Sequence, residues 1–178
     1  MISWLDFDDF MREISVPPVE KRVTEIVESI ISKVRSEGDK ALVELTRRFD
    51  KPDFTEEDLV IEPEPTISGP LAEQMSLAAE RITGFAQAMM SSLGRAAFPA
   101  GTGVRFVPVD KAGIYAPGGR APYPSSVLMG AIPAKVAGVR EIYVASPPPV
   151  HPAIVHASWL SGARGIIQAG GAQAIAAM

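Results

Sequence analysis

Apolar residues recur every three or four positions in the amino-terminal part of the chain, which is the spacing of one face of an α-helix. One such run extends from Val23 to Val34 and stops before Gly38, a residue type that commonly ends helices. A second run follows Asp39, a favoured residue at a helix start, and reaches Phe49. The pattern predicts two consecutive helices, and we assign this amino-terminal helical hairpin to residues 1–52.

The following segment, residues 53–107, begins as an acidic and proline-rich connection. Thr55 and Asp58 have the spacing of a capping turn. Residues 59–61 are apolar and lie between polar stretches, which is typical of a short edge strand. We therefore expect a connection that contributes one short strand to a sheet.

A longer helical pattern then runs from Leu71 to Leu93, with Gly94 as its expected end. Its flexible methionines suit irregular gaps between packed elements, so we expect Met75, Met89 and Met90 to lie in the core. Three of the four residues at 104–107 are valine or phenylalanine, residue types favoured in strands, which predicts a strand that leads into the next segment.

From residue 108 to residue 178, short apolar runs alternate with helical patterns. Strands are expected at 112–116, 141–146 and 165–168, and the helices between and after them start near Ser125 and Ser126 as caps, near Pro152 and near Gly171. Connections this short require neighbouring strands to be parallel. The chain is therefore predicted to be an α/β protein, with a Rossmann-like parallel sheet and flanking helices preceded by the amino-terminal helical segment.

Composition excludes several functions. The 178 residues are 47% hydrophobic, carry a formal net charge of -4 and include no cysteine. The basic residues are scattered, so we expect no nucleic-acid partner, and a chain without cysteine fits a reducing cytoplasm. The longest uncharged stretch, residues 142–163, is broken by four prolines, so no membrane span is expected. The first ten residues are acidic and do not resemble a secretory signal.

Two diglycine turns follow predicted strands, Gly118-Gly119 and Gly170-Gly171, and each precedes a helix. The carboxyl ends of parallel strands are where α/β proteins bind nucleotides. Neither turn has the spacing G-x-G-x-x-G, and no acidic residue ends the strand at 141–146. The pattern alone therefore fits nucleotide binding or ordinary tight turns. For nucleotide binding, the strands at 112–116 and 165–168 should lie side by side, so that both turns open onto one crevice.

Catalytic and metal-binding candidates are weak. His151 and His156 are five residues apart, which separates them by about 140° around a helix. No aspartate or glutamate follows Glu141, so a zinc site within this chain alone is not expected. The serines near the first glycine turn lack a G-x-S-x-G motif and a neighbouring histidine. We assign no catalytic residue and no metal ligand to the chain.

Several longer sequence motifs, taken together, resemble those of one known protein family. In order along the chain they are GIYAPGG, PYPSSVLM, IPAKVAGV, ASPPP and GGAQAIAA, and upstream of them stand SEGDKALVELTRRFD and AAERITGF. Together these segments resemble the histidinol dehydrogenase family, and the likeness covers almost the whole chain from about Val23.

The resemblance implies a function. Enzymes of this family oxidise L-histidinol to L-histidine with NAD, in the last steps of histidine biosynthesis, and they are zinc-containing homodimers. In the family, the tyrosine of the first glycine motif and the glutamine of the second contact NAD. The matching positions are Tyr115 and Gln173, and with Gly118 and Gly119 they are the expected cofactor-binding residues. Each has a plainer alternative, because a tyrosine can simply pack, a glutamine can cap a helix and glycines can serve tight turns.

The family's zinc ligands and its Glu-His proton-transfer pair lie beyond the GGAQAIA motif. We therefore expect this chain to correspond to the amino-terminal, NAD-binding portion, incomplete relative to the family fold, inactive alone and binding no zinc by itself. Two alternatives remain. The chain could belong to an NAD-dependent dehydrogenase of another polar alcohol in the same family, or it could be a non-catalytic binding or assembly module.

Overall fold

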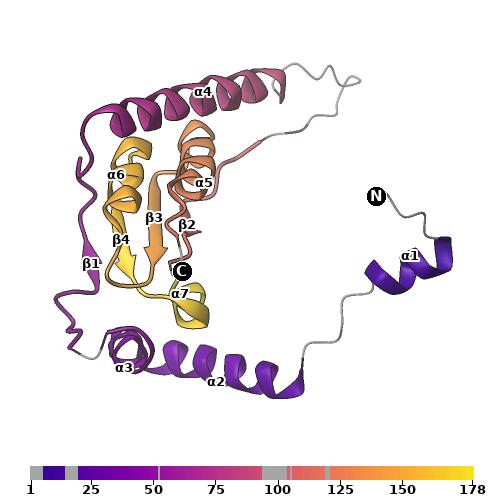
Figure 1. Ribbon diagram of the computed structural model, residues 1–178, viewed down its shortest axis with the longest axis vertical. Coiled ribbons are helices and arrows are strands. Elements are labelled where there is room, and N and C mark those ends of the chain that lie inside the picture. Colours follow the sequence, from indigo (N-terminus) through magenta and orange to yellow (C-terminus); the bar gives the residue numbers. More distant parts are fainter. Residues whose placement is uncertain (1–5, 15–19, 52, 94–103, 105, 119–120) are drawn as a thin grey trace.

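The carboxyl ends of three parallel strands meet at one edge of a mixed sheet, and the helices pack around that arrangement (Figure 1). The computed structural model describes residues 6–14, 20–51, 53–93, 104, 106–118 and 121–178. In chain order the elements are α1 (Phe7–Ile14), α2 (Lys21–Glu37), α3 (Asp39–Phe49), β1 (Val60–Ile61), α4 (Pro70–Leu93), β2 (Lys111–Tyr115), α5 (Pro124–Val136), β3 (Glu141–Ser146), α6 (Pro152–Ser161), β4 (Gly165–Gln168) and α7 (Gly171–Ala177).

The sheet has the strand order β1-β4-β3-β2. β3 pairs in parallel with β2 on one side and with β4 on the other, and β1 adds an antiparallel edge to β4. The strands predicted at 59–61, 112–116, 141–146 and 165–168, the alternation of strand and helix and the α/β class are therefore confirmed. The strand at 112–116 and the strand at 165–168 are not neighbours, however, because β3 lies between them. Consecutive strands joined by a short crossover usually lie side by side, which accounts for the order β2, β3, β4.

The two faces of the sheet carry different helices. Val144 and Ile166 are fully buried in the cluster that includes residues of α5 and α6, and α4 packs outside those two helices. Side chains alternate along a strand, so Ala145 and Ile167 point to the opposite face, where they meet α7 and the α2–α3 pair. The described part of the chain thus stacks a helical layer on each side of the sheet.

The helical hairpin has a core of its own that continues into the sheet. Leu42, Leu45 and Phe54 are buried in this cluster, and Ile167 of β4 and Ala176 of α7 pack against it. Gly38 separates α2 from α3, as the sequence predicted. The contact with β4 and α7 brings the carboxyl end of α3 to the sheet edge where the three parallel strands end.

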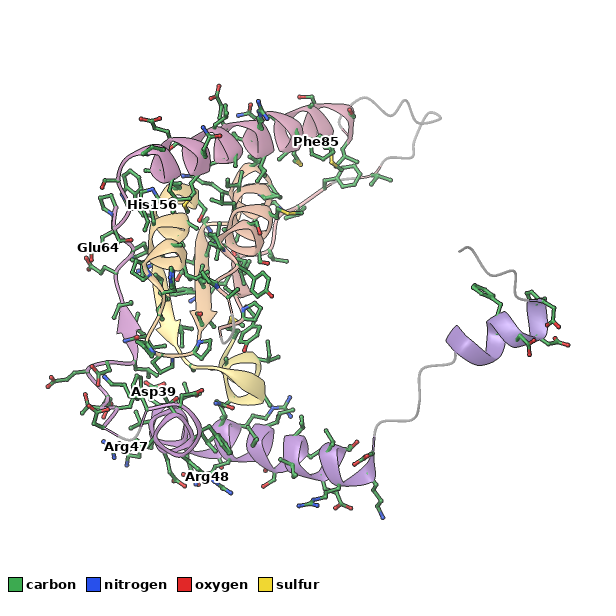
Figure 2. All side chains as sticks on the ribbon, viewed as in Figure 1. Asp39, Arg47, Arg48, Glu64, Phe85 and His156 are labelled. Carbon is green, nitrogen blue, oxygen red and sulfur yellow. The ribbon has the colours of Figure 1, made fainter. Side chains whose placement is uncertain are left out.

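Several local expectations were wrong. Val104, Phe106 and Val107 are exposed and form no strand, because no described segment lies beyond β2 to pair with them. Met75 is buried, but Met89 is 54% exposed and Met90 is also exposed. The carboxyl end of α4 extends past the helices it covers (Figure 1). Exposed Phe85 lies on the same part of α4 (Figure 2).

Two further features differ from the sequence analysis. Ser125 and Ser126 do not cap α5, because Tyr123 is the N-cap residue, makes no side-chain capping bond and is followed by Pro124. Proline suits the first helical position because its missing N–H needs no partner there. Helix α1, which the sequence analysis did not predict, stands apart from the other elements, with Phe7 and Phe10 exposed (Figure 1). Among the described residues, no helix is long and apolar enough to cross a membrane.

Two helical glycines predict opposite effects of adding a methyl group. A Cβ at Gly130 in α5 would stand 2.9 Å from Cγ1 of Ile114, whereas a Cβ at Gly84 in α4 would meet nothing within 4 Å. Gly130→Ala should destabilise the protein by about 1–3 kcal/mol through overpacking. Gly84→Ala should stabilise it by up to about 1 kcal/mol, because alanine has the higher helix propensity. Urea unfolding of both variants measures the difference, and equal effects would contradict the packing of α5 on β2.

The Thr55–Asp58 turn gives a pH-dependent prediction. The backbone N–H and hydroxyl of Thr55 donate to Oδ2 of Asp58 at 2.8 and 2.9 Å, which holds the pKa of Asp58 below its ordinary value of 3.8. A lowered folded-state pKa stabilises the fold above the unfolded value and ceases to do so as the pH falls through the folded value. Asp58→Asn should therefore lower Tm at pH 7, and this deficit should shrink below pH 3.8. A deficit that is the same at both pH values would contradict the bond.

Candidate functional site

A cleft of about 760 Å³ lies at the carboxyl edge of the sheet. Its walls come from three segments that are distant in sequence: the loop after β2, the stretch from the end of β3 through the following loop to the first turn of α6, and the end of α3. Gly118 lines it from the first of these, Ser146 and the three prolines at 147–149 from the second, and Phe49 and Asp50 from the third. The volume is within the ordinary range of small-molecule sites.

Both glycine turns pack against one residue, Pro147. A Cβ at Gly118 would stand only 2.4 Å from Cγ of Pro147, and a Cβ at Gly170 would stand 2.9 Å from its Cβ. A side chain at either position would clash with the proline ring. The two turns therefore converge at one edge although their strands are separated by β3. Glycine leaves the backbone accessible beside the cleft at Gly118.

Tyr115 connects the two turns directly. It is the last residue of β2, is partly buried, and its phenol oxygen accepts the backbone N–H of Gly171 at 3.2 Å. Because β2 and β4 flank β3, this bond joins the end of β2 to the turn after β4 across the end of β3. The phenol O–H remains able to donate a hydrogen bond.

Gln173 lies at the start of α7 and is only 3% exposed. Its Oε1 is 3.1 Å from the point where a Cβ of Gly171 would stand, so the amide folds back over the turn that Tyr115 contacts. Neither Tyr115 nor Gln173 borders the cleft itself, whereas Gly118 does. Gly119 lies outside the described residues.

The sequence analysis missed most of the cleft wall. Ser146 is buried at the end of β3, and His151 is the N-cap of α6, where its Nδ1 accepts the N–H of Ala153 at 3.1 Å. Asp50 has an exposed side chain, but the surrounding wall removes part of the water from its carboxyl, which raises its pKa above the ordinary value. Serine and histidine beside a predicted strand end could have been noticed; no local signal places Asp50 there.

The described residues do not fit a zinc site. Among them, no group of three or more histidine, cysteine, aspartate or glutamate side chains could hold a metal ion. His151 is used as a helix cap. His156, labelled in Figure 2, is buried, and its Nδ1 accepts the N–H of Ile67 at 3.2 Å. Each histidine therefore uses its Nδ1 to accept a backbone N–H, His151 from Ala153 and His156 from Ile67.

The fold and site define an α/β protein with glycine turns and a cleft at the carboxyl edge of its parallel strands. Comparison with known proteins gives the family, since the family model described as histidinol dehydrogenase matches residues 10–178. The chain belongs to the histidinol dehydrogenase family.

Individual relatives agree. The histidinol dehydrogenase of Cereibacter sphaeroides is 44% identical over 167 residues, which are 88% of this chain and 38% of the relative. That of Syntrophotalea carbinolica is 40% identical over an alignment covering 100% of this chain and 46% of the relative. The crystal structure of histidinol dehydrogenase from Elizabethkingia anophelis matches with a TM-score of 0.76 and 30% identity, over 92% of this chain and 40% of that one. The chain thus spans less than half the length of these relatives.

The bond between Tyr115 and Gly171 predicts a measurable coupling between the two turns. Tyr115→Phe removes the acceptor of the Gly171 N–H, so hydrogen exchange at Gly171 should accelerate and the protein should lose about 1 kcal/mol of stability. Tyr123→Phe, which removes an exposed phenol at the start of α5, is the control and should change neither quantity. Unchanged exchange at Gly171 in Tyr115→Phe would contradict the contact.

Proposed function

We propose that this chain is the NAD-binding part of an enzyme that oxidises L-histidinol to L-histidine. Membership of the histidinol dehydrogenase family supports an oxidoreductase of this kind. The observation that carries the NAD assignment is the meeting of the two glycine turns on Pro147 beside a cleft of about 760 Å³. Such a place, at the carboxyl ends of parallel strands, is where α/β folds bind dinucleotides.

The residues of the proposed site fit a polar, phosphate-bearing ligand. Gly118 lines the cleft and has no side chain to obstruct approach to its backbone, and Gly119 is included in the proposed site from the sequence motif. Tyr115 supplies a phenol that can donate, and Gln173 supplies an amide that can donate and accept. NAD, when bound, would accept a hydride from the alcohol carbon; the task of these residues is to hold and orient it.

We propose that the zinc ligands and the catalytic residues lie in a part of the complete enzyme outside this 178-residue chain. Zinc belongs to the complete enzyme in this proposal, with none of its ligands among the described residues, and this chain contributes no catalytic residue. The protein is proposed to be a cytoplasmic homodimer that acts on a small molecule, with neither nucleic acid nor membrane as a partner. The 178-residue chain alone should show no turnover.

Titration of NAD into the full-length protein tests the cofactor site. Tyr115→Ala and Gln173→Ala should each raise the Kd for NAD about 2- to 10-fold, the effect of losing one neutral hydrogen bond. Gln87→Ala, at an exposed position of α4, is the matched control for the glutamine and should bind as the parent does. Two unchanged dissociation constants would count against the assignment of both residues.

Turnover tests the substrate and the role of the chain. The full-length protein should reduce NAD with L-histidinol, and the 178-residue chain alone should not. Reduction of NAD only with a different polar alcohol would replace the substrate assignment. A full-length protein that binds no NAD would leave a non-catalytic module as the better description.

A further inference from the structure

Asp50 occupies an unusual position for a carboxylate. It follows the last residue of α3 as the C-cap and lines the cleft together with Gly118 and Ser146. Its Oδ1 lies 3.5 Å from the point where a Cβ of Gly170 would stand. A residue of the amino-terminal hairpin thus reaches the second glycine turn.

This position disfavours the ionised form of the Asp50 carboxyl. The carboxyl end of a helix carries partial negative charge, so a carboxylate there is repelled rather than stabilised. Partial burial of the Asp50 carboxyl also disfavours its ionised form and raises its pKa above the ordinary value. Among the described residues, the carboxyl of Asp50 has no hydrogen bond and no ion pair. Unfavourable placements of this kind persist where a ligand supplies the missing partner.

The residues around Asp50 indicate which kind of ligand group would bind its carboxylate. In dinucleotide-binding α/β folds, an acidic residue near the end of a strand accepts the hydroxyl groups of a ribose. Here β3 ends at Ser146 and carries no such acid. Asp50 brings a carboxylate to the same cleft from another element, beside glycine turns suited to phosphate groups. A neutral diol with two O–H donors matches a partly desolvated carboxylate that has no ion pair among the described residues.

We propose that Asp50 is a cofactor-binding residue whose carboxylate accepts hydrogen bonds from the vicinal hydroxyls of one ribose of the dinucleotide. This inference rests on the proposed function, since it requires that NAD occupy the cleft. It assigns to the amino-terminal hairpin a direct part in holding the cofactor.

The test is calorimetric titration of NAD into the full-length protein and into Asp50→Ala and Asp50→Asn. Losing hydrogen bonds to a charged acceptor should raise the Kd about 10- to 100-fold in Asp50→Ala. Asp53→Ala, which removes an exposed carboxylate three residues away that does not line the cleft, should bind NAD as the parent does. Binding by Asp50→Ala within twofold of the parent would overturn the proposal.

Two NAD analogues locate the contact, each lacking both hydroxyls of one of the two riboses. With one of them, the parent and Asp50→Ala should bind equally weakly, because the variant has nothing further to lose. If Asp50→Ala weakens the binding of both analogues as much as it weakens the binding of NAD, Asp50 acts without touching a ribose. The proposal would then fail, although the parent protein would still bind NAD. If the parent protein binds no NAD at all, the proposed function fails as well.

Stability separates binding from a structural role. Because the folded-state pKa of Asp50 is raised, its ionisation costs stability as the pH rises from the ordinary value of 3.8 through the folded value. Asp50→Asn should therefore have a Tm equal to or above that of the parent at pH 7, and this advantage should disappear below pH 3.8. A lower Tm for Asp50→Asn at pH 7 would show that the carboxylate serves the fold instead.

Discussion

The parallel pairing of β3 with a strand on each side is the constraint on which the rest of the structure depends. Val144 and Ala145 in β3 are fully buried, one toward each helical layer. Hydrogen bonding on both edges and burial on both faces leave β3 no freedom to slip in register. Because β2 and β4 run parallel to it, all three carboxyl ends reach one edge, and the glycine turns that follow β2 and β4 must meet there.

The opposite edge of the sheet carries charge pairs. Glu141 at the start of β3 lies 3.3 Å from Nζ of Lys111 in β2 and 3.2 Å from Arg164, which precedes β4. Exposed ion pairs of this kind contribute little free energy. They agree with the register of the three strands, but burial of the apolar side chains is the larger effect. Charge pairs and candidate chemistry thus lie at opposite ends of the same strands.

The connection between β1 and α4 is held in place by α6. The hydroxyl of Thr66 donates to the carbonyl of Pro152 at 2.7 Å, and the N–H of Ile67 donates to His156. These bonds fix a proline-rich stretch that makes no regular structure of its own. On the other side, Arg47 donates to the carbonyl of Phe54 and fastens the turn after α3. The segment from α3 to α4 therefore wraps the sheet and leaves Asp50 at the cleft.

The sequence by itself determined the local elements. The helical spacing before Gly38, the strand at 141–146 and the glycine turns follow from periodicity and backbone preference, which act within a few residues. The motifs around Tyr115 and Gln173 also sufficed to indicate the family. Only tertiary structure decided that β3 separates the other two parallel strands, that Met89 and Met90 are exposed, and that Asp50 faces the cleft. Those outcomes depend on packing between segments that are far apart in the sequence, and a pattern within a few residues does not predict such packing.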